Sequence, residues 1–115
     1  WPSSAASDVY KRQNLYNGKN FLMKELYVKS KGILSLQKHF HRSEHWLVTQ
    51  GKPKITLNKK VFYKKVNEAT FIPLGAIHRI ENPFKKPVKI IEAQLGSILK
   101  ETDIVRYQDI YGRIK

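Results

Sequence analysis

Turn-forming residues recur at short intervals along this chain, and the runs between them are rich in side chains that favour β-strands. Those runs hold Val, Ile, Tyr, Phe and Thr, and helix signals are poor almost everywhere. Many short strands separated by turns indicate an all-β sandwich or barrel. The turn signals are Asn17-Gly18, Lys31-Gly32, Gly51-Lys52-Pro53, Asn58-Lys59-Lys60, Pro73-Leu74-Gly75 and Asn82-Pro83.

Two regions give the clearest strand predictions. Ile55-Thr56-Leu57 and Val61-Phe62-Tyr63 alternate in polarity, which predicts the two arms of a hairpin around Asn58-Lys59-Lys60. Residues 88–95 form a further expected strand with apolar side chains on both faces. The one short helical turn that we expect lies near the C-terminus, around residues 108–112.

The size of the chain predicts a single small domain with one continuous core, since 115 residues are too few for two. Residues 1–13 are small and polar and show no strand pattern, so we assign them to a tail that is disordered or foreign to the domain of residues 14–115. No apolar run approaches the ~18 residues of a membrane span, and no signal-peptide pattern opens the chain. We therefore expect a cytoplasmic protein without a membrane partner.

The chain lacks cysteine, which excludes disulfides, thiolate metal ligands and a cysteine nucleophile. Its net charge of +13 raises the question of a nucleic-acid partner. The lysines are spread through every segment instead of forming one stripe, which disfavours that partner. A compositional origin of the charge, or attraction of anionic small molecules such as sugar phosphates, fits the pattern better.

Imidazole groups are concentrated in residues 37–46. In an extended strand alternate side chains share a face, so Gln37, His39 and His41 are expected to project together. A turn at Arg42-Ser43 would let Glu44 open the next strand, with its side chain across from His39. This arrangement predicts a site that two neighbouring strands share.

His78 follows the Pro73-Leu74-Gly75 turn and could complete that site from a distant strand. One carboxylate, two imidazoles and one amide oxygen suit a borderline divalent ion such as Zn²⁺, Mn²⁺, Fe²⁺ or Ni²⁺. The predicted metal ligands are thus Gln37, His39, Glu44 and His78. The competing interpretation makes them hydrogen-bonded residues of a metal-free barrel.

The same residues resemble the two sequence motifs of the cupin family. Glu44 is followed by six residues and Gly51, His39 has the spacing of the second histidine of the first motif, and Gln37 stands in the place of its first histidine. Asn67 stands where the second motif usually has glycine. The second motif is otherwise complete, as Pro73, Gly75, His78 and Asn82. The resemblance implies a cupin-type double-stranded β-helix, or jelly-roll, barrel.

Residues 34–46 are similar, more specifically, to the signature of the type II mannose-6-phosphate isomerase domain, which forms the C-terminal part of bifunctional mannose-1-phosphate guanylyltransferase/mannose-6-phosphate isomerases. Residues 94–97, 103–107 and 111–113 resemble the C-terminal segment of that family. The resemblance implies metal-dependent interconversion of mannose 6-phosphate and fructose 6-phosphate, which feeds GDP-mannose and polysaccharide biosynthesis. It implies a divalent cofactor, with Zn²⁺ first and Mn, Fe, Co or Ni as alternatives, and a homodimer.

Five further residues are candidates for substrate contact or catalysis. A sugar phosphate needs a fixed guanidinium, and Arg42 and Arg79 flank the predicted ligands. We expect His41 to contact substrate, and Arg79 to serve catalysis as well as phosphate binding. Glu92, or a histidine such as His45, would act as the catalytic base.

Two alternatives to an isomerase remain open at this point. The chain could be a non-catalytic sugar-phosphate-binding or dimerisation module that serves a guanylyltransferase domain in cis or in trans. A basic β-domain that binds nucleic acid would show strongly salt-dependent binding and no metal. Metal content separates the isomerase from the nucleic-acid protein, and turnover separates it from the binding module.

Overall fold

The structure is a computed structural model that describes residues 10–108. These residues form ten β-strands and no helix, which confirms the all-β prediction. Among them there is no helix with the length and apolar character of a membrane span. The strands are β1 Tyr10–Asn17, β2 Phe21–Val28, β3 Leu36–Lys38, β4 Arg42–Gln50, β5 Lys54–Leu57, β6 Lys60–Tyr63, β7 Ala69–Ile72, β8 His78–Glu81, β9 Val88–Gly96 and β10 Val105–Gln108.

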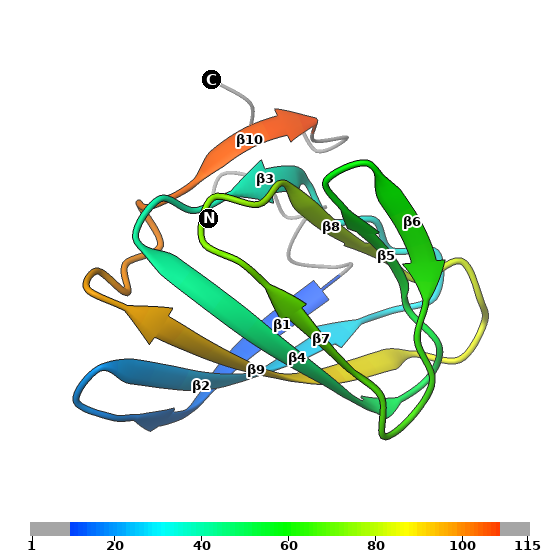
Figure 1. Cartoon of the computed structure of the whole chain (residues 1–115). Helices are drawn as coiled ribbons and strands as arrows, with labels where there is room; N and C mark the ends of the chain where they lie inside the picture. Colours follow the sequence, from blue (N-terminus) through cyan, green and yellow to red (C-terminus); the bar gives the residue numbers. More distant parts are fainter. Residues whose placement is uncertain (1–9, 109–115) are drawn as a thin grey trace.

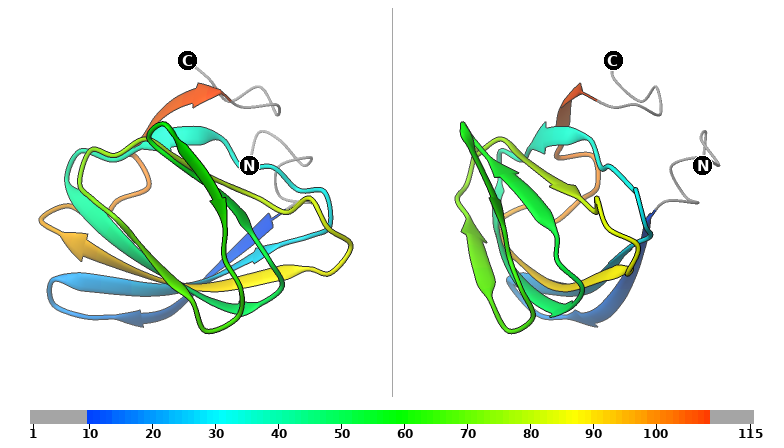
Figure 2. Two further views of the ribbon diagram at one scale, coloured as in Figure 1. Left: turned by 45° about the vertical axis from the view of Figure 1, so that its right-hand side comes forward. Right: turned by 90° about the vertical axis from the view of Figure 1, so that its right-hand side faces the viewer.

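The strands make two five-stranded antiparallel sheets that face each other across the core (Figures 1 and 2). One sheet has the order β1-β2-β9-β4-β7 and the other has the order β10-β3-β8-β5-β6. Strands far apart in sequence are neighbours, since β9 lies between β2 and β4. Such crossing connections between two sheets are those of a double-stranded β-helix.

Alternation along β2, β4 and β9 divides the interior into an apolar half and a polar half. Every second side chain of these strands is buried. Val28 lies opposite Val88, and Leu26 and Val48 lie on either side of Ile90. These residues belong to the apolar core, which forms one end of the barrel.

The next rows across the same three strands are polar. Lys24 and Trp46 are the register partners of Glu92, one on each side. Glu44 is in turn the partner of Gln94, and all of these side chains are buried. The polar half of the barrel therefore starts where the apolar core ends.

The predicted hairpin and the predicted strand at residues 88–95 are both confirmed. β5 pairs with β6 from Lys54–Tyr63 to Leu57–Lys60, which leaves Asn58 and Lys59 in the turn. Asn58 takes the left-handed conformation that such a turn requires, with φ of 54°. Asn67 does the same with φ of 74°, which explains how asparagine replaces the glycine of the cupin motif.

The expected domain boundary after Gln13 is wrong for residues 10–13, because they form the first half of β1. β1 pairs with β2 in a register that begins at Tyr10 and Val28. The strand is exposed along most of its length, so its side chains lack the alternation that identifies a strand in sequence. Residues 1–9 lie outside the described residues, and so does most of the expected helical turn at 108–112; Gln108 ends β10.

Candidate metal centre

Three of the four predicted ligands meet in the polar half of the barrel. His39 follows β3, Glu44 lies in β4 and His78 begins β8. Each of the three residues is at most 3% exposed. One ligand atom from each lies within 4.8 Å of the others, close enough for all three to bind a single ion.

Backbone carbonyls fix which nitrogen of each imidazole faces this cluster. Nδ1 of His39 lies 2.6 Å from the carbonyl oxygen of Asp103, and Nδ1 of His78 lies 3.0 Å from that of Ala76. A carbonyl oxygen can only accept, so each Nδ1 carries the proton and each Nε2 presents a lone pair. Metal-binding histidines are typically oriented by such a bond on the other nitrogen.

The Nε2 atoms of both rings face the carboxylate of Glu44. Nε2 of His39 lies 3.4 Å from one carboxylate oxygen, and Nε2 of His78 lies 3.9 Å from the other. Within residues 10–108, Nε2 of His78 is buried without a hydrogen-bond partner. An orphaned buried lone pair opposite a carboxylate fits a bound cation, since leaving it unpaired costs about 1–3 kcal/mol.

Burial also keeps both imidazoles neutral. Burial, together with the nearby cation of Arg42, lowers the pKa of His39 to about 3. Burial lowers the pKa of His78 to about 4, against the hydrogen bond to Ala76. At neutral pH both side chains are therefore in the form that can donate electrons to a metal.

Gln37, the fourth predicted ligand, lies on the same inward face. Its Cα is the register partner of His78 on β8, and directly opposed residues of an antiparallel pair share a face. The side chain is buried, and its amide oxygen accepts a hydrogen bond from the Ser35 hydroxyl at 3.3 Å. Gln37 is placed beside the cluster, and its role as a ligand stays a prediction.

Arg42 lies inside the site instead of in the expected turn, because β4 already begins at this residue. Arg42 and Glu44 therefore share the inward face, and Arg42 is 2% exposed. Its Nε donates to Glu44 at 3.0 Å, and one terminal nitrogen lies 3.1 Å from Nε2 of His39. The guanidinium thus pairs with the Glu44 carboxylate and with the His39 lone pair that an ion would use.

Glu92 lies on the inward face of β9 and forms a carboxylate pair with Glu44. The indole nitrogen of Trp46 donates to both carboxylates at 3.0 Å, and the Gln94 amide donates to Glu92 at 2.7 Å. Burial raises the pKa of Glu92, and the charge of Glu44 raises it further. Two close carboxylates cannot both ionise freely, so Glu92 is suited to carry a proton at higher pH than an ordinary glutamate.

Two predicted catalytic residues are not brought to this cluster. His45 is exposed on the outer face of its sheet and packs against Phe71 with the two rings tilted and their centroids 4.8 Å apart. Arg79 alternates with His78 along β8 and points outward, where it donates to the carbonyl of Leu34 and to Gln108. Both residues neighbour a ligand in sequence, and in a strand this places them on the opposite face.

His41 lies at the rim of the site. Its side chain is 49% exposed, and its Nδ1 lies 3.2 Å from the carboxylate of Asp103. That carboxylate also accepts hydrogen bonds from the backbone nitrogens of Phe40 and His41. The substrate contact expected of His41 stays a prediction, and the rim position is compatible with it.

Sequence reasoning missed four charged residues around the cluster. Arg12 reaches Glu92 at 3.7 Å from β1, within the segment excluded as a tail. Lys24 is buried on β2 and pairs with Glu101. Asp103 accepts a hydrogen bond from His39 through its backbone carbonyl, although the two residues are 64 apart in sequence. Only Lys24 had a local sequence signal of an inward position, because it alternates with Leu22 and Leu26, which are buried.

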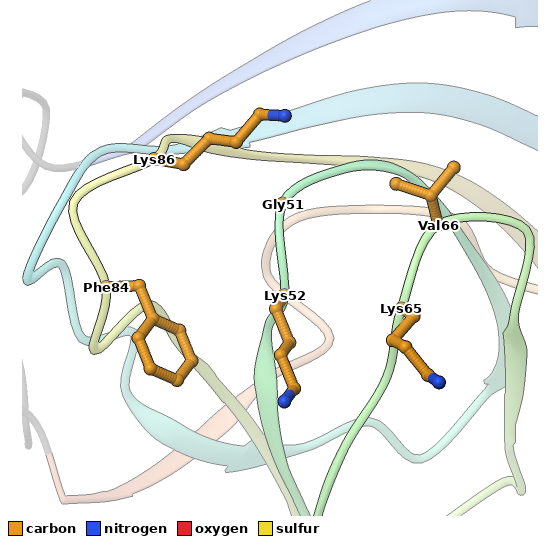
Figure 3. A pocket seen from close by; sticks show the side chains of 6 residues that line it. All are labelled: Gly51, Lys52, Lys65, Val66, Phe84 and Lys86. Carbon is orange, nitrogen blue, oxygen red and sulfur yellow. The ribbon is translucent and has the colours of Figure 1, made fainter.

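Two open hollows lie on the described surface. One, of about 390 Å³, borders the site, and its lining includes His41, Lys100 and Asp103. The other, of about 480 Å³, lies beyond the opposite end of β4, where Phe84 and Lys52 project side by side near Lys65 (Figure 3). The first hollow lies on the side of the ligand cluster, because Asp103, which lines it, also hydrogen-bonds His39.

The comparisons with known structures agree with the fold. A double-stranded β-helix protein from Klebsiella pneumoniae superposes with a TM-score of 0.75 and 11% identity, covering 91% of this chain and 96% of that one. The cupin domain of Cnp3 from Schizosaccharomyces pombe gives a TM-score of 0.73 and 19% identity, covering 76% of this chain and 65% of that one. At these identities the likeness establishes the fold alone, a cupin-type barrel.

The curated relatives are closer in sequence. The alginate biosynthesis protein AlgA of Pseudomonas fluorescens is 44% identical over 110 residues, which cover 92% of this chain. The mannose-1-phosphate guanylyltransferase ManC of Salmonella typhimurium is 42% identical over 111 residues, covering 93% of this chain. The chain spans 23% of the length of each of these two relatives.

A sequence model of one family matches nearly the whole chain. The family is described as the mannose-6-phosphate isomerase C-terminal domain, and the match covers residues 6–109. The match includes all four predicted ligands, all of β1 and part of the segment assigned to the tail. The chain therefore belongs to the family of mannose-6-phosphate isomerase C-terminal domains.

Proposed function

We propose that this domain interconverts mannose 6-phosphate and fructose 6-phosphate with the help of a divalent metal. The observation that carries the proposal is the convergence of two neutral imidazole nitrogens on one buried carboxylate, at His39, His78 and Glu44. Membership of the isomerase C-terminal family supports the choice of substrate. The names of the relatives support a place in mannose phosphate metabolism and polysaccharide biosynthesis.

The donor set fits a borderline divalent ion. His39, Glu44 and His78 would hold it, with Gln37 as a fourth ligand, and Zn²⁺ is the first candidate ahead of Mn, Fe, Co or Ni. When bound, such an ion acts as a Lewis acid toward sugar hydroxyl and carbonyl oxygens. Arg42 would keep Glu44 in place by donating to its carboxylate. Its contact with Nε2 of His39 would give way to the ion, because that nitrogen has a single lone pair.

Glu92 is the proposed base. The isomerisation moves one proton from C2 of the aldose to C1 and another from the C2 hydroxyl to the C1 oxygen. The same carboxyl group can take up the carbon-bound proton and give it back. Its raised pKa makes Glu92 a stronger base than an ordinary glutamate, and a stronger base takes the proton more readily from a weak carbon acid. Trp46 and Gln94 fix the carboxylate in place by donating to its two oxygens.

A coupled assay of mannose 6-phosphate conversion tests the proposal. We expect turnover that a chelator abolishes and that added Zn²⁺, Mn²⁺ or Co²⁺ restores. His39→Ala and His78→Ala should lose activity, whereas His45→Ala, a matched histidine on the outer face, should keep it. Folded, metal-loaded protein that shows no turnover with any ion would contradict the proposal.

The second candidate is a non-catalytic sugar-phosphate-binding or dimerisation module of a guanylyltransferase system. The chain spans 23% of relatives such as the guanylyltransferase ManC, which favours a role beside another domain in cis or in trans. Exposed Leu47, Phe71 and Leu95 on the outer face of the β9-β4-β7 edge could pair two copies into a homodimer. A cytoplasmic location, too, stays a prediction.

A further inference from the structure

Lys24 is a buried cation at the edge of the candidate site. It is 4% exposed and lies on the inward face of β2, between Leu22 and Leu26. On the neighbouring strand its register partner is Glu92, the proposed base. A buried ammonium group is costly unless an anion faces it, so this position requires a negative partner.

The partner of Lys24 comes from the segment between β9 and β10. We call residues 97–103, between β9 and the approach to β10, the strap. Among the described residues, Glu101 of the strap is the carboxylate that pairs with the Lys24 ammonium. Lys24 is buried in this pair, but the Glu101 side chain is 68% exposed. The carboxylate can therefore leave for water without losing a buried environment, whereas the ammonium cannot.

Two guanidinium groups lie around the same position. Arg12 reaches Glu92 at 3.7 Å on the strand beside Lys24, and Arg42 donates to the carbonyl of Lys100, the residue before Glu101. The charges of Arg12, Lys24 and Arg42 together outweigh partial burial and lower the pKa of Glu101. The Glu101 carboxylate thus occupies a place where three cations favour an anion.

We propose that Lys24 forms a phosphate subsite of the barrel, and that Glu101 holds this subsite closed until the phosphate group of a sugar phosphate displaces it. The choice of a sugar phosphate rests on the proposed function, but the subsite itself does not. A phosphate monoester carries about −1.5 to −2 charges near pH 7 and three acceptor oxygens, against a single charge for Glu101. Exchange of the Glu101 carboxylate for a phosphate group keeps Lys24 paired with an anion and adds negative charge near Arg12 and Arg42.

The position of the subsite agrees with a substrate that reaches the metal ligands. Lys24, Glu92 and Trp46 form one row across three strands, and Glu44 lies in the next row. Neighbouring strands are about 4.8 Å apart, so Lys24 lies roughly 10 Å from the Glu44 strand. A hexose phosphate spans a comparable distance between its phosphorus and C1. Its phosphate at Lys24 would leave C1 and C2 near Glu92 and the metal ligands.

Isothermal titration with inorganic phosphate, on protein loaded with equal amounts of Zn²⁺, tests the subsite without relying on turnover. Lys24→Met keeps most of the length of the side chain and removes its charge, so we expect phosphate affinity to fall at least about 10-fold. Glu101→Gln removes the competing anion, and we expect affinity to rise several-fold. Lys52→Met, in the hollow at the opposite end of β4, is the charge-matched control and should bind like the wild type.

The outcomes separate this inference from the proposed function. Lys24→Met protein that is folded by circular dichroism and binds phosphate like the wild type overturns the subsite, and so does unchanged affinity in Glu101→Gln. A parallel assay should show a raised KM for mannose 6-phosphate in Lys24→Met. Phosphate binding that follows the expected pattern in protein without any turnover would support the subsite and contradict the isomerase.

Discussion

At the scale of single residues, hydrogen bonds to the backbone determine the chemistry of the candidate site. The carbonyls of Asp103 and Ala76 fix the tautomers of His39 and His78, so that both lone pairs face Glu44. From the sequence alone, these histidines could equally be core residues that are hydrogen-bonded within a metal-free barrel. The structure favours a metal site because the bonded nitrogen of each ring is the one that points away from the carboxylate.

The role of Glu92 can be tested by removing its charge. Glu92→Gln keeps the shape and the contacts to Trp46 but cannot accept a proton from carbon, so kcat should fall by about 10²- to 10⁴-fold. Metal content and the unfolding midpoint serve as controls and should change little. Glu81→Gln, which alters an outer-face glutamate paired with Lys54, is the matched variant and should keep its activity. Turnover of Glu92→Gln within a few-fold of the wild type would exclude Glu92 as the base.

Asp103 anchors the strap, and its charge should stabilise the fold. Burial opposes ionisation, but hydrogen bonds from the backbone nitrogens of Phe40 and His41 outweigh it and lower the pKa of Asp103. A lowered pKa means that this stabilisation is present above the ordinary value of 3.8 and is lost as the pH falls through the folded value.

Asp103→Asn should therefore lower the free energy of unfolding at pH 7 by about 1–3 kcal/mol, measured with urea. The difference from the wild type should shrink in acid, as the wild-type carboxylate takes up its proton. A difference that is unchanged or larger at pH 3 would contradict this account of Asp103.

At the scale of the strands, β4 and β9 position Glu44 and Glu92 because alternate side chains of each strand point inward. The sequence allowed the hairpin at Asn58 and the strand that carries Glu92 to be predicted. It placed the turn before Glu44 at Arg42-Ser43, whereas β4 begins at Arg42. That shift put Arg42 on the inward face. Local patterns could not show this, because pairing of Arg42 with Gly96 across the sheet decides where the strand starts.

At Gly96 the backbone of β9 lies close to the backbone of His41 and Arg42, where β4 begins. A Cβ atom at this position would lie 2.0 Å from the carbonyl oxygen of His41 and 2.7 Å from Cα of Arg42. Both are backbone atoms, so Gly96→Ala should destabilise the domain by about 1–3 kcal/mol and weaken metal binding. Thermal unfolding and metal analysis would measure these two effects.

Gly75→Asn is the matched control for Gly96→Ala. Gly75 has φ of 80°, which asparagine tolerates, and no atom lies within 4 Å of an added Cβ. We expect this variant to unfold near the wild-type midpoint. Equal stability of Gly96→Ala and wild type would show that β9 and β4 do not approach each other as described.

At the scale of the whole molecule, the barrel separates the residues that stabilise it from those that act. Buried Val, Ile and Leu side chains fill one end, and charged residues fill the other. The general fold was accessible from the turn spacing. The composition of the polar end could not be predicted from the sequence, because Arg12, Lys24 and Asp103 reach that end from segments far apart in the chain. Since the Arg42–Glu44 pair compensates charge without an ion, we expect the metal-free protein to remain folded.

A zinc titration of the metal-free protein, followed by isothermal calorimetry, tests the central claim most directly. The account predicts one Zn²⁺ per chain in the wild type and in His45→Ala, whose imidazole lies on the outer face. It predicts that His78→Ala lowers zinc affinity by at least about 100-fold. Removing a direct ligand should weaken binding at least as much as the largest effects of changing a residue that only hydrogen-bonds a ligand. A wild-type protein that binds no zinc, or a His78→Ala variant that binds it equally well, would contradict a metal centre at His39, Glu44 and His78.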